Sequence, residues 1–277
     1  MESKPLSDIV DETKRILTEA DRRGVTIRLF GGMAIRFHAP SATHRSLVRK
    51  YADIDVMGVR NQAKEIRKLF TDLGYSSRDV FNALQGDRRL IFQDLENKRR
   101  VDVFLNVFEM CHKFDFSDRL TIDKETISLA DLLATKLQVV EMTEREYRDI
   151  TALIHDHEIG DTDAPETING KYLAQLCADQ WGIYKTFVTT IGNVLAHLNE
   201  LPLDQKDKDI VRKRLEDLRQ RFEKVPKTIR WKARARVGEK VQWYELPEQD
   251  KEIVRQDVLR SDASESQGGS RASGESH

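Results

Sequence analysis

The sequence predicts an α+β fold, in which a small mixed β-sheet with flanking helices precedes a helical C-terminal domain. Up to about residue 126, short apolar runs alternate with amphipathic stretches, as strands mixed with helices do. Beyond that point apolar residues recur at helical spacing. Residues 260–277 contain no large apolar side chain, so this segment cannot bury enough surface to offset the entropy cost of ordering. We therefore expect domains at 1–126 and 127–259, and a disordered tail at 260–277.

In the first domain we expect a helix, a strand, a helix, a strand, a helix and then three strands. Residues 7–23 place Ile9, Val10, Ile16 and Leu17 among charges, as an amphipathic helix does, and Gly24 ends it. A strand at 25–30 then leads directly into a helix at 31–38. The other strands are expected at 51–57, 81–84, 89–95 and 100–108, with a helix at 61–73 and a hairpin turn at 96–98.

The second domain is expected to be all-helical. Residues 128–142 repeat leucine at helical spacing, at Leu129, Leu132, Leu133 and Leu137. Further helices are expected at 143–155, 171–177, 181–198 and 207–222.

The bulk composition excludes several classes of protein. The 277 residues carry a formal net charge of −1, which gives no overall attraction to nucleic acid or to an anionic membrane. No apolar run is long enough to cross a bilayer, and residues 1–10 lack the apolar region of a signal peptide. The two cysteines, Cys111 and Cys177, match no zinc or redox spacing, so we expect buried reduced thiols and a cytoplasmic protein.

Three aspartates lie on two of the predicted strands. Side chains alternate between the faces of a strand, so Asp53 and Asp55 share one face while Ile54 and Val56 enter the core. Asp102 comes from a second strand. Three carboxylates on one face favour a site for Mg²⁺ or Mn²⁺ over a buried apolar surface.

A glycine pair precedes these aspartates. Gly31 and Gly32 lie where the strand at 25–30 turns into the following helix, and such a turn offers backbone N–H groups to a phosphate. A metal site beside a phosphate site indicates chemistry on a nucleoside triphosphate.

In order and spacing, these residues resemble the nucleotidyltransferase fold of the DNA polymerase β superfamily. They are most similar to the abortive-infection type IV toxins and to the aminoglycoside and lincosamide nucleotidyltransferases. Those sequences commonly carry Arg-x-Thr-x-Asp-hydrophobic-Asp; here Arg49 holds the arginine position and Tyr51 replaces threonine. The group's Lys-Asp-x-x-Asp-Ile motif is similar to residues 145–150, and Lys136 matches a lysine of the relatives.

The resemblance implies a role for each of these residues. Asp53, Asp55 and Asp102 would ligate two metal ions, and Asp102 would also accept the proton of the attacking hydroxyl. The nucleotide would be bound by five residues: Gly31, Gly32, Arg49, Lys136 and Arg148. The acceptors implied are an RNA end (tRNA in particular), a protein or a small antibiotic. The resemblance also implies an antitoxin partner, and it implies no association with a membrane.

Two other functions are compatible with these residues, and two local features allow more than one interpretation. Asp-x-Asp also suits a glycosyltransferase that holds Mn²⁺ and a nucleotide sugar, and the sheet could instead be a non-catalytic binding scaffold. Residues 224–240 are rich in basic side chains, with Trp231 and Trp243 nearby, which suits either a phosphate-bearing partner or a solvated edge strand. His155 and His157 lie in a His-Asp-His-Glu run that resembles a metal site, but we interpret it as a helix end.

Overall fold

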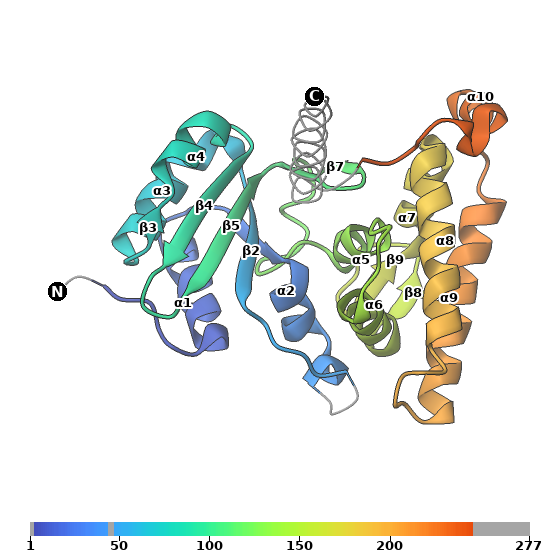
Figure 1. The fold of residues 1–277 in the computed structure, drawn as a ribbon, viewed down its shortest axis with the longest axis horizontal. Helices are drawn as coiled ribbons and strands as arrows, with labels where there is room; N and C mark the ends of the chain where they lie inside the picture. The colour runs from blue at the N-terminus through green and yellow to red at the C-terminus, as the bar shows by residue number, and fades with distance from the viewer. Residues whose placement is uncertain (1–2, 44–46, 246–277) are drawn as a thin grey trace, which may run out of the picture.

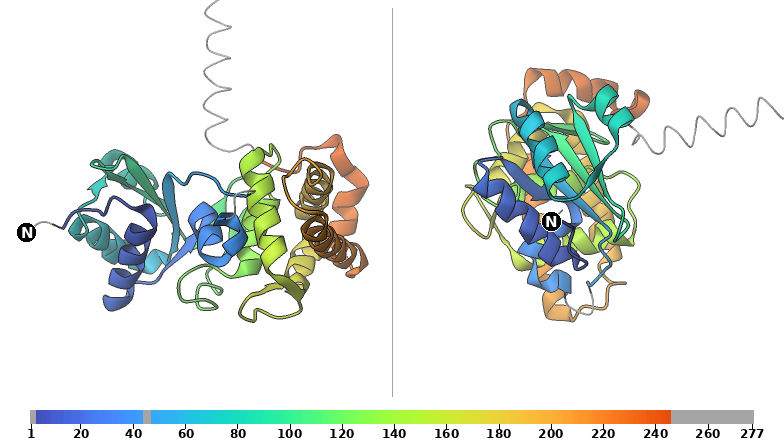
Figure 2. Two further views of the ribbon diagram at one scale, coloured as in Figure 1. Left: turned by 90° about the horizontal axis from the view of Figure 1, so that it is seen from below. Right: turned by 90° about the vertical axis from the view of Figure 1, so that its left-hand side faces the viewer.

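The computed structural model describes residues 3–43 and 47–245. Figure 1 shows a sheet with its helices at one end of the molecule and a group of helices at the other, and the views in Figure 2 agree with this division. The expected tail at 260–277 lies outside the described residues. Within the described ranges, no helix combines the length and the apolar character needed to cross a membrane.

The sheet is mixed, as the sequence predicts. Strands β2 and β5 run parallel at its centre, and every other neighbouring pair is antiparallel. The strand order is β1 (Ile27–Phe30), β2 (Asp53–Gly58), β5 (Arg99–Leu105), β4 (Arg89–Asp94) and β3 (Ser76–Ser77). Ile54 and Val56 of β2 are fully buried, so the expected alternation of core and site residues along this strand is confirmed.

Four helices accompany the sheet: α1 (Ile9–Arg22), α2 (Gly31–His38), α3 (Ala63–Asp72) and α4 (Asp79–Gln85). Short 3₁₀ turns lie at Pro40–Thr43 and Arg60–Gln62. Helix α3 buries Ile66, Leu69 and Phe70, three residues of the predicted apolar face. The strand predicted at 81–84 is wrong, because these residues belong to α4.

Helix α4 is stabilised by one side chain, Asn82, which hydrogen-bonds to the backbone of β4. Asn82 accepts a hydrogen bond from the Ile91 N–H at 2.8 Å and donates one to the Ile91 carbonyl at 3.0 Å. The amide therefore satisfies the backbone of β4 at a position where a strand would otherwise pair. A short apolar run fits a helix or a strand equally well, and this long-range contact decides between them.

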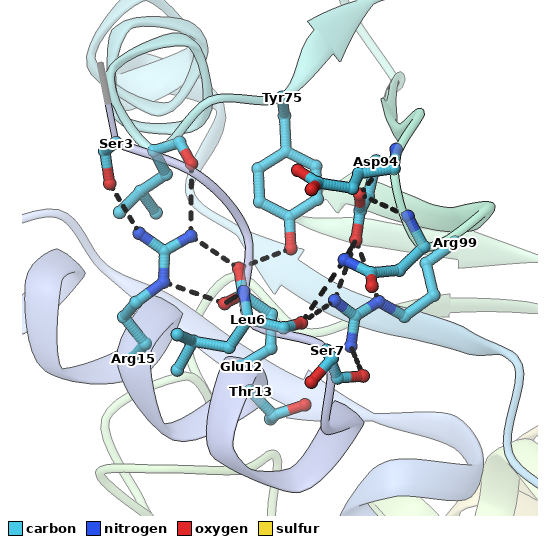
Figure 3. A network of polar contacts seen from close by, with 12 residues as sticks. Ser3, Leu6, Ser7, Glu12, Thr13, Arg15, Tyr75, Asp94 and Arg99 are labelled. Carbon is cyan, nitrogen blue, oxygen red and sulfur yellow. Dashed lines mark hydrogen bonds and ion pairs between the residues drawn. The ribbon is translucent and has the colours of Figure 1, made fainter. Parts of the chain in front are cut away.

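A polar network attaches the N-terminal segment to the sheet (Figure 3). Glu12 has no exposed surface and accepts hydrogen bonds from the Leu6 N–H at 2.8 Å and the Tyr75 hydroxyl at 2.7 Å. Arg15 pairs with the same carboxylate at 2.7 Å. A buried charge is tolerated only when it is paired and hydrogen-bonded in this way. The network therefore joins Leu6 and α1 to Tyr75, the residue just before β3.

The predicted strand at 100–108 is interrupted at Asn106, whose φ of 64° is left-handed. The chain continues as a separate hairpin of β6 (Val107–Glu109) and β7 (Lys113–Asp115). Residues 125–127 then return to the sheet: the Leu29 N–H donates to the Glu125 carbonyl at 2.8 Å, and the Ile127 N–H donates to the Leu29 carbonyl at 3.0 Å. The expected domain boundary near residue 126 thus lies on a segment that is bonded to β1.

The second half contains the five expected helices: α5 (Leu129–Leu137), α6 (Glu144–Asp156), α7 (Gly170–Asp179), α8 (Trp181–His197) and α9 (Gln205–Lys224). Helix α5 ends before residue 142, and α6 begins in a capping box made by Thr143 and Glu146. The all-helical prediction is wrong in one detail: β8 (Glu158–Gly160) and β9 (Thr167–Asn169) form a parallel pair. Cys111 and Cys177 are buried thiols, as expected.

The edge strand considered for residues 230–237 is also wrong. These residues form α10 (Ile229–Val237), whose N-terminus is capped by the Thr228 side chain. The Thr228 N–H donates to the Ala178 carbonyl at 3.2 Å, so α7 sets the point at which α10 begins. The basic residues Arg230, Lys232, Arg234 and Arg236 alternate as they would on an edge strand, but the packing of the segment against the neighbouring helices decides its conformation.

Candidate active site

The turn between β1 and α2 places the glycine pair beside the aspartates. Gly31 has a φ of 65°, which is unfavourable for any residue with a Cβ. A Cβ at this position would also lie 2.6 Å from Asp55 Oδ2. The first N–H groups of a helix have no partner within that helix, and both glycines line a cavity. The turn therefore presents bare backbone to that cavity, immediately next to a carboxylate.

The central parallel pair brings the three aspartates together. Asp55 of β2 and Asp102 of β5 are direct partners in the ladder, and Asp53 precedes Asp55 by two residues on the same face. Asp53 is exposed, Asp55 is half-buried and Asp102 is 4% exposed. Burial, followed by the negative charges of Asp102 and Asp53, raises the pKa of Asp55 to about 7.

Asp102 is covered by two arginines. Arg89 Nη2 of β4 lies 2.8 Å from Oδ1, and Arg100 Nε of β5 lies 2.6 Å from Oδ2. Asp53 and Asp55 line the cavity, whereas Asp102 does not. Accordingly, residues 3–43 and 47–245 contain no group of three or more His, Cys, Asp or Glu side chains already arranged to hold a metal ion.

Two cations, one from the loop before β2 and one from the helical half, surround a buried carboxylate beside the cavity. The carboxylate of Asp149 in α6 is 2% exposed and takes a bidentate ion pair from Arg49, at 2.7 and 2.9 Å. Lys136 Nζ of α5 lies 2.8 Å from Asp149 Oδ2. Although burial acts in the opposite direction, Lys136 and Arg49 hold the pKa of Asp149 below its usual value. Asp149 therefore fixes two of the predicted nucleotide-binding cations.

Gly32 makes room for one of these cations. A Cβ at Gly32 would collide with the guanidinium of Arg49, which also stacks 4.3 Å from the centre of the Tyr51 ring. The second glycine of the pair is therefore needed for the arginine to approach the first turn of α2. Tyr51, which replaces the threonine of the resembling sequences, forms the other side of this arginine site.

The cavity has a volume of about 420 Å³, within the range of small-molecule sites. Its lining carries the acidic side chains of Asp53, Asp55, Glu141 and Glu146 and the basic side chains of Arg49, Lys50, Lys136 and Arg145. An apolar wall comes from Phe30, Phe104, Phe108 and Met110, and the three phenylalanine rings contact one another edge to face at 5.0–5.4 Å. Arg148 lies outside this lining: its guanidinium donates to the Val48 carbonyl at 3.1 Å.

Sequence reasoning missed the arginines on Asp102 and the phenylalanine wall. Arg100 precedes Asp102 by two residues, so strand alternation alone could have placed it on the same face. Arg89 had no such signal, because its position depends on the register of β4 against β5. The wall combines Phe30 of β1, Phe104 of β5 and Phe108 of the β6–β7 hairpin, and only the fold brings these three rings together.

No family model matches the chain, and no curated protein matches it. Among solved structures, the chain is similar to the solution structure of the antibiotic-resistance factor ANT(2'')-Ia, at 15% identity and a TM-score of 0.34. That similarity covers 50% of this chain and 80% of the other. The crystal structure of ANT(2'')-Ia in complex with adenylyl-2''-tobramycin is similar at 14% identity and a TM-score of 0.31, over 75% of this chain and 97% of the other. Scores this low describe a distant likeness, and we base the function on the geometry of the cavity.

Proposed function

We propose that the chain is a metal-dependent nucleotidyltransferase, which moves a nucleoside monophosphate from a triphosphate to an acceptor hydroxyl. One observation carries this proposal: the aspartates of β2, the glycine turn and the basic side chains of Arg49, Lys136 and Arg145 all line a single cavity. A triphosphate requires cationic partners for its oxygens, and displacement at its α-phosphorus requires carboxylates that hold the accompanying metal ions. The cavity supplies both.

The acidic residues fit a hard divalent cation. Mg²⁺ and Mn²⁺ take carboxylate, water and phosphate oxygens, and Asp53 and Asp55 offer carboxylates at the cavity surface. Burial and then the negative charges of Asp102 and Asp53 raise the pKa of Asp55, and a bound cation would offset the repulsion between these acids. Asp53 and Asp55 would hold the metal, with Asp102 as a third ligand. When bound, the ions would neutralise the triphosphate and lower the pKa of the attacking hydroxyl.

The other residues would bind and orient the nucleotide. The backbone N–H groups of Gly31 and Gly32 would donate to the β- and γ-phosphates, and Arg49 and Lys136 would supply positive charge. Arg145 lines the same cavity and would add to this charge. Arg148 is left out of this set, because its guanidinium bonds to the backbone of Val48.

Incubation with each α-labelled triphosphate, Mg²⁺ and a cell lysate tests the proposal. We expect a labelled product in the presence of Mg²⁺ and none with a chelator or with the Asp55→Asn variant. The size and nuclease sensitivity of the product identify an RNA, a protein or a small molecule. Metal-dependent binding of a nucleotide sugar with no labelled product would support the glycosyltransferase instead. The absence of any nucleotide binding would support the non-catalytic scaffold.

A macromolecular acceptor is favoured by the surface of α10. Residues 224–240 contain seven Lys or Arg and one Glu, in a chain whose net charge is −1. Arg230, Lys232 and Arg236 are exposed, and none of them forms an ion pair within the described residues.

From α10 the chain runs back to the β6–β7 hairpin (Figure 1), where the Glu245 N–H donates to the Cys111 carbonyl at 3.0 Å. Met110, one residue earlier, lines the cavity, so we propose that a phosphate-bearing acceptor such as an RNA end follows this path.

Neutralising α10 is expected to weaken this acceptor selectively. Lys232→Gln with Arg236→Gln removes two phosphate contacts, so the KM for an RNA acceptor should rise about tenfold and the slope of log affinity against log salt should flatten by about one to two units. The affinity for the triphosphate should stay unchanged. Lys206→Gln with Lys213→Gln, at exposed sites in α9, is the matched control. Equal effects of the two pairs on the acceptor would contradict a specific role for α10.

A further inference from the structure

The carboxylate best placed to complete a metal site with Asp55 is already occupied by protein cations. Arg89 Nη2 and Nε lie 2.8 and 2.9 Å from Asp102 Oδ1. Arg100 Nη2 donates to the same oxygen at 3.0 Å, and its Nε lies 2.6 Å from Oδ2. Two guanidinium groups supply the same positive charge as one divalent ion. The ion pairs therefore neutralise Asp102 in a way that excludes a metal from its oxygens.

The strand geometry explains why both arginines reach this carboxylate. Arg100 and Asp102 are two residues apart on β5 and so share a face. Arg89 of β4 is the ladder partner of Phe104, the next residue on that same face of β5. The Arg89 guanidinium lies 4.6 Å from the centre of the Phe104 ring, and that ring lines the cavity. Arg89 is thus held between the buried aspartate and the cavity.

Arg100 is incompletely satisfied by Asp102. Its Nε is buried and forms no hydrogen bond within the described residues, although it lies 2.6 Å from a carboxylate oxygen. The contact is an ion pair without good hydrogen-bond geometry, so an anionic acceptor placed in line with Nε would gain a hydrogen bond that Asp102 does not accept. The side chains of Arg89 and Arg100 are 22% and 32% exposed, so neither is fully enclosed by protein.

We propose that Arg89 and Arg100 form a latch on Asp102, which keeps the metal site incomplete until an anionic substrate draws the arginines away. The proposal rests on the proposed function, because it takes the triphosphate as that anion. Arg89 and Arg100 are positioning residues: they act on the reaction by controlling when Asp102 becomes available as a ligand. A divalent ion should therefore bind weakly to the chain alone and strongly together with a triphosphate.

Mn²⁺ titration followed by electron paramagnetic resonance tests the latch without turnover. Arg100→Gln and Arg89→Gln should each bind Mn²⁺ about tenfold more tightly than the wild type when no nucleotide is present, since one competing positive charge is gone. A non-hydrolysable triphosphate should tighten Mn²⁺ binding strongly in the wild type and much less in the variants. Arg100→Lys keeps the charge and should stay close to the wild type.

Arg88→Gln is the matched control, because it removes the same charge next to Arg89 from a side chain that is 72% exposed and pairs with Asp87. Circular dichroism confirms that each variant is folded. Unchanged or weaker Mn²⁺ binding in both Arg89→Gln and Arg100→Gln would overturn the latch. So would a wild type that binds Mn²⁺ equally well with and without triphosphate. Tighter binding in the variants without labelled product from any triphosphate would keep the latch and refute nucleotidyl transfer.

Discussion

Asp55→Asn is expected to lower turnover at least about a thousandfold, which corresponds to about 4 kcal/mol of transition-state stabilisation. Asp55 lies at the centre of the acidic cluster, between Asp53 on its own strand and Asp102 on the next. It also contacts the glycine turn, where a Cβ on Gly31 would lie 2.6 Å from its Oδ2. An amide in its place keeps the shape of the side chain but removes the charge that would hold a metal ion beside the triphosphate. Label transfer from the α-labelled triphosphate measures this loss.

The same substitution is expected to stabilise the metal-free chain at neutral and higher pH. Burial and the neighbouring acids raise the pKa of Asp55 from 3.8 to about 7, so the folded chain holds this proton more tightly than the unfolded chain. The free energy of unfolding of the wild type therefore falls as the pH rises through that window, and the cost is complete above it. An asparagine avoids this cost. In a chelator, Asp55→Asn should have a higher Tm than the wild type near pH 8, with a smaller difference near pH 5.

Asp87→Asn is the control for these measurements, since its side chain is 69% exposed and lies away from the cavity lining. It should change neither turnover nor the pH dependence of the Tm. Wild-type turnover in Asp55→Asn would remove the proposed mechanism. A Tm difference between Asp55→Asn and the wild type that is identical at both pH values would show that the three acids do not crowd one another.

Asp149→Asn is expected to lower the free energy of unfolding by about 3 kcal/mol or more, because it leaves two cations in the interior without their counter-charge. Arg49 and Lys136 have side chains only 13% and 11% exposed, and both pair with this carboxylate. The three residues come from the loop before β2, from α5 and from α6, so the cluster connects the sheet to the helical half. Denaturant unfolding measures the change.

Two further variants sharpen this prediction. Glu216→Gln removes an exposed carboxylate from α9 and should change stability by less than about 0.5 kcal/mol. Adding Lys136→Met to Asp149→Asn removes one of the unpaired cations and should restore part of the lost stability. If Asp149→Asn unfolded at the same denaturant concentration as the wild type, the cluster would not stabilise the link between the two halves. A weakened triphosphate affinity is expected alongside, because Arg49 and Lys136 would lose their fixed positions.

The sequence predicted elements correctly where contacts between nearby residues decide the conformation, and wrongly where a contact with a distant residue decides it. Strand β2 was predictable because a period of two places Ile54 and Val56 in the core and the aspartates on the opposite face. Helix α3 was predictable from its amphipathic face, and α6 began where Thr143 could cap it. The strand predicted at 81–84 and the edge strand considered for 230–237 were wrong because both segments are short and fit either conformation. In each case a contact with a distant residue, Asn82 with Ile91 or Thr228 with Ala178, decided the outcome.

The sequence by itself determined the α+β class of the fold, the acidic face of β2 and the glycine turn before α2, because each follows from local periodicity or from backbone freedom at one position. Only the tertiary structure decided what surrounds the aspartates. Arg49 and Asp149 are 100 residues apart in the chain, and Arg89 reaches Asp102 only through the register of β4 against β5. Ion pairs of this kind depend on where strands and helices come to rest against one another. Their partners have no fixed spacing in the sequence, so residue order alone cannot reveal them.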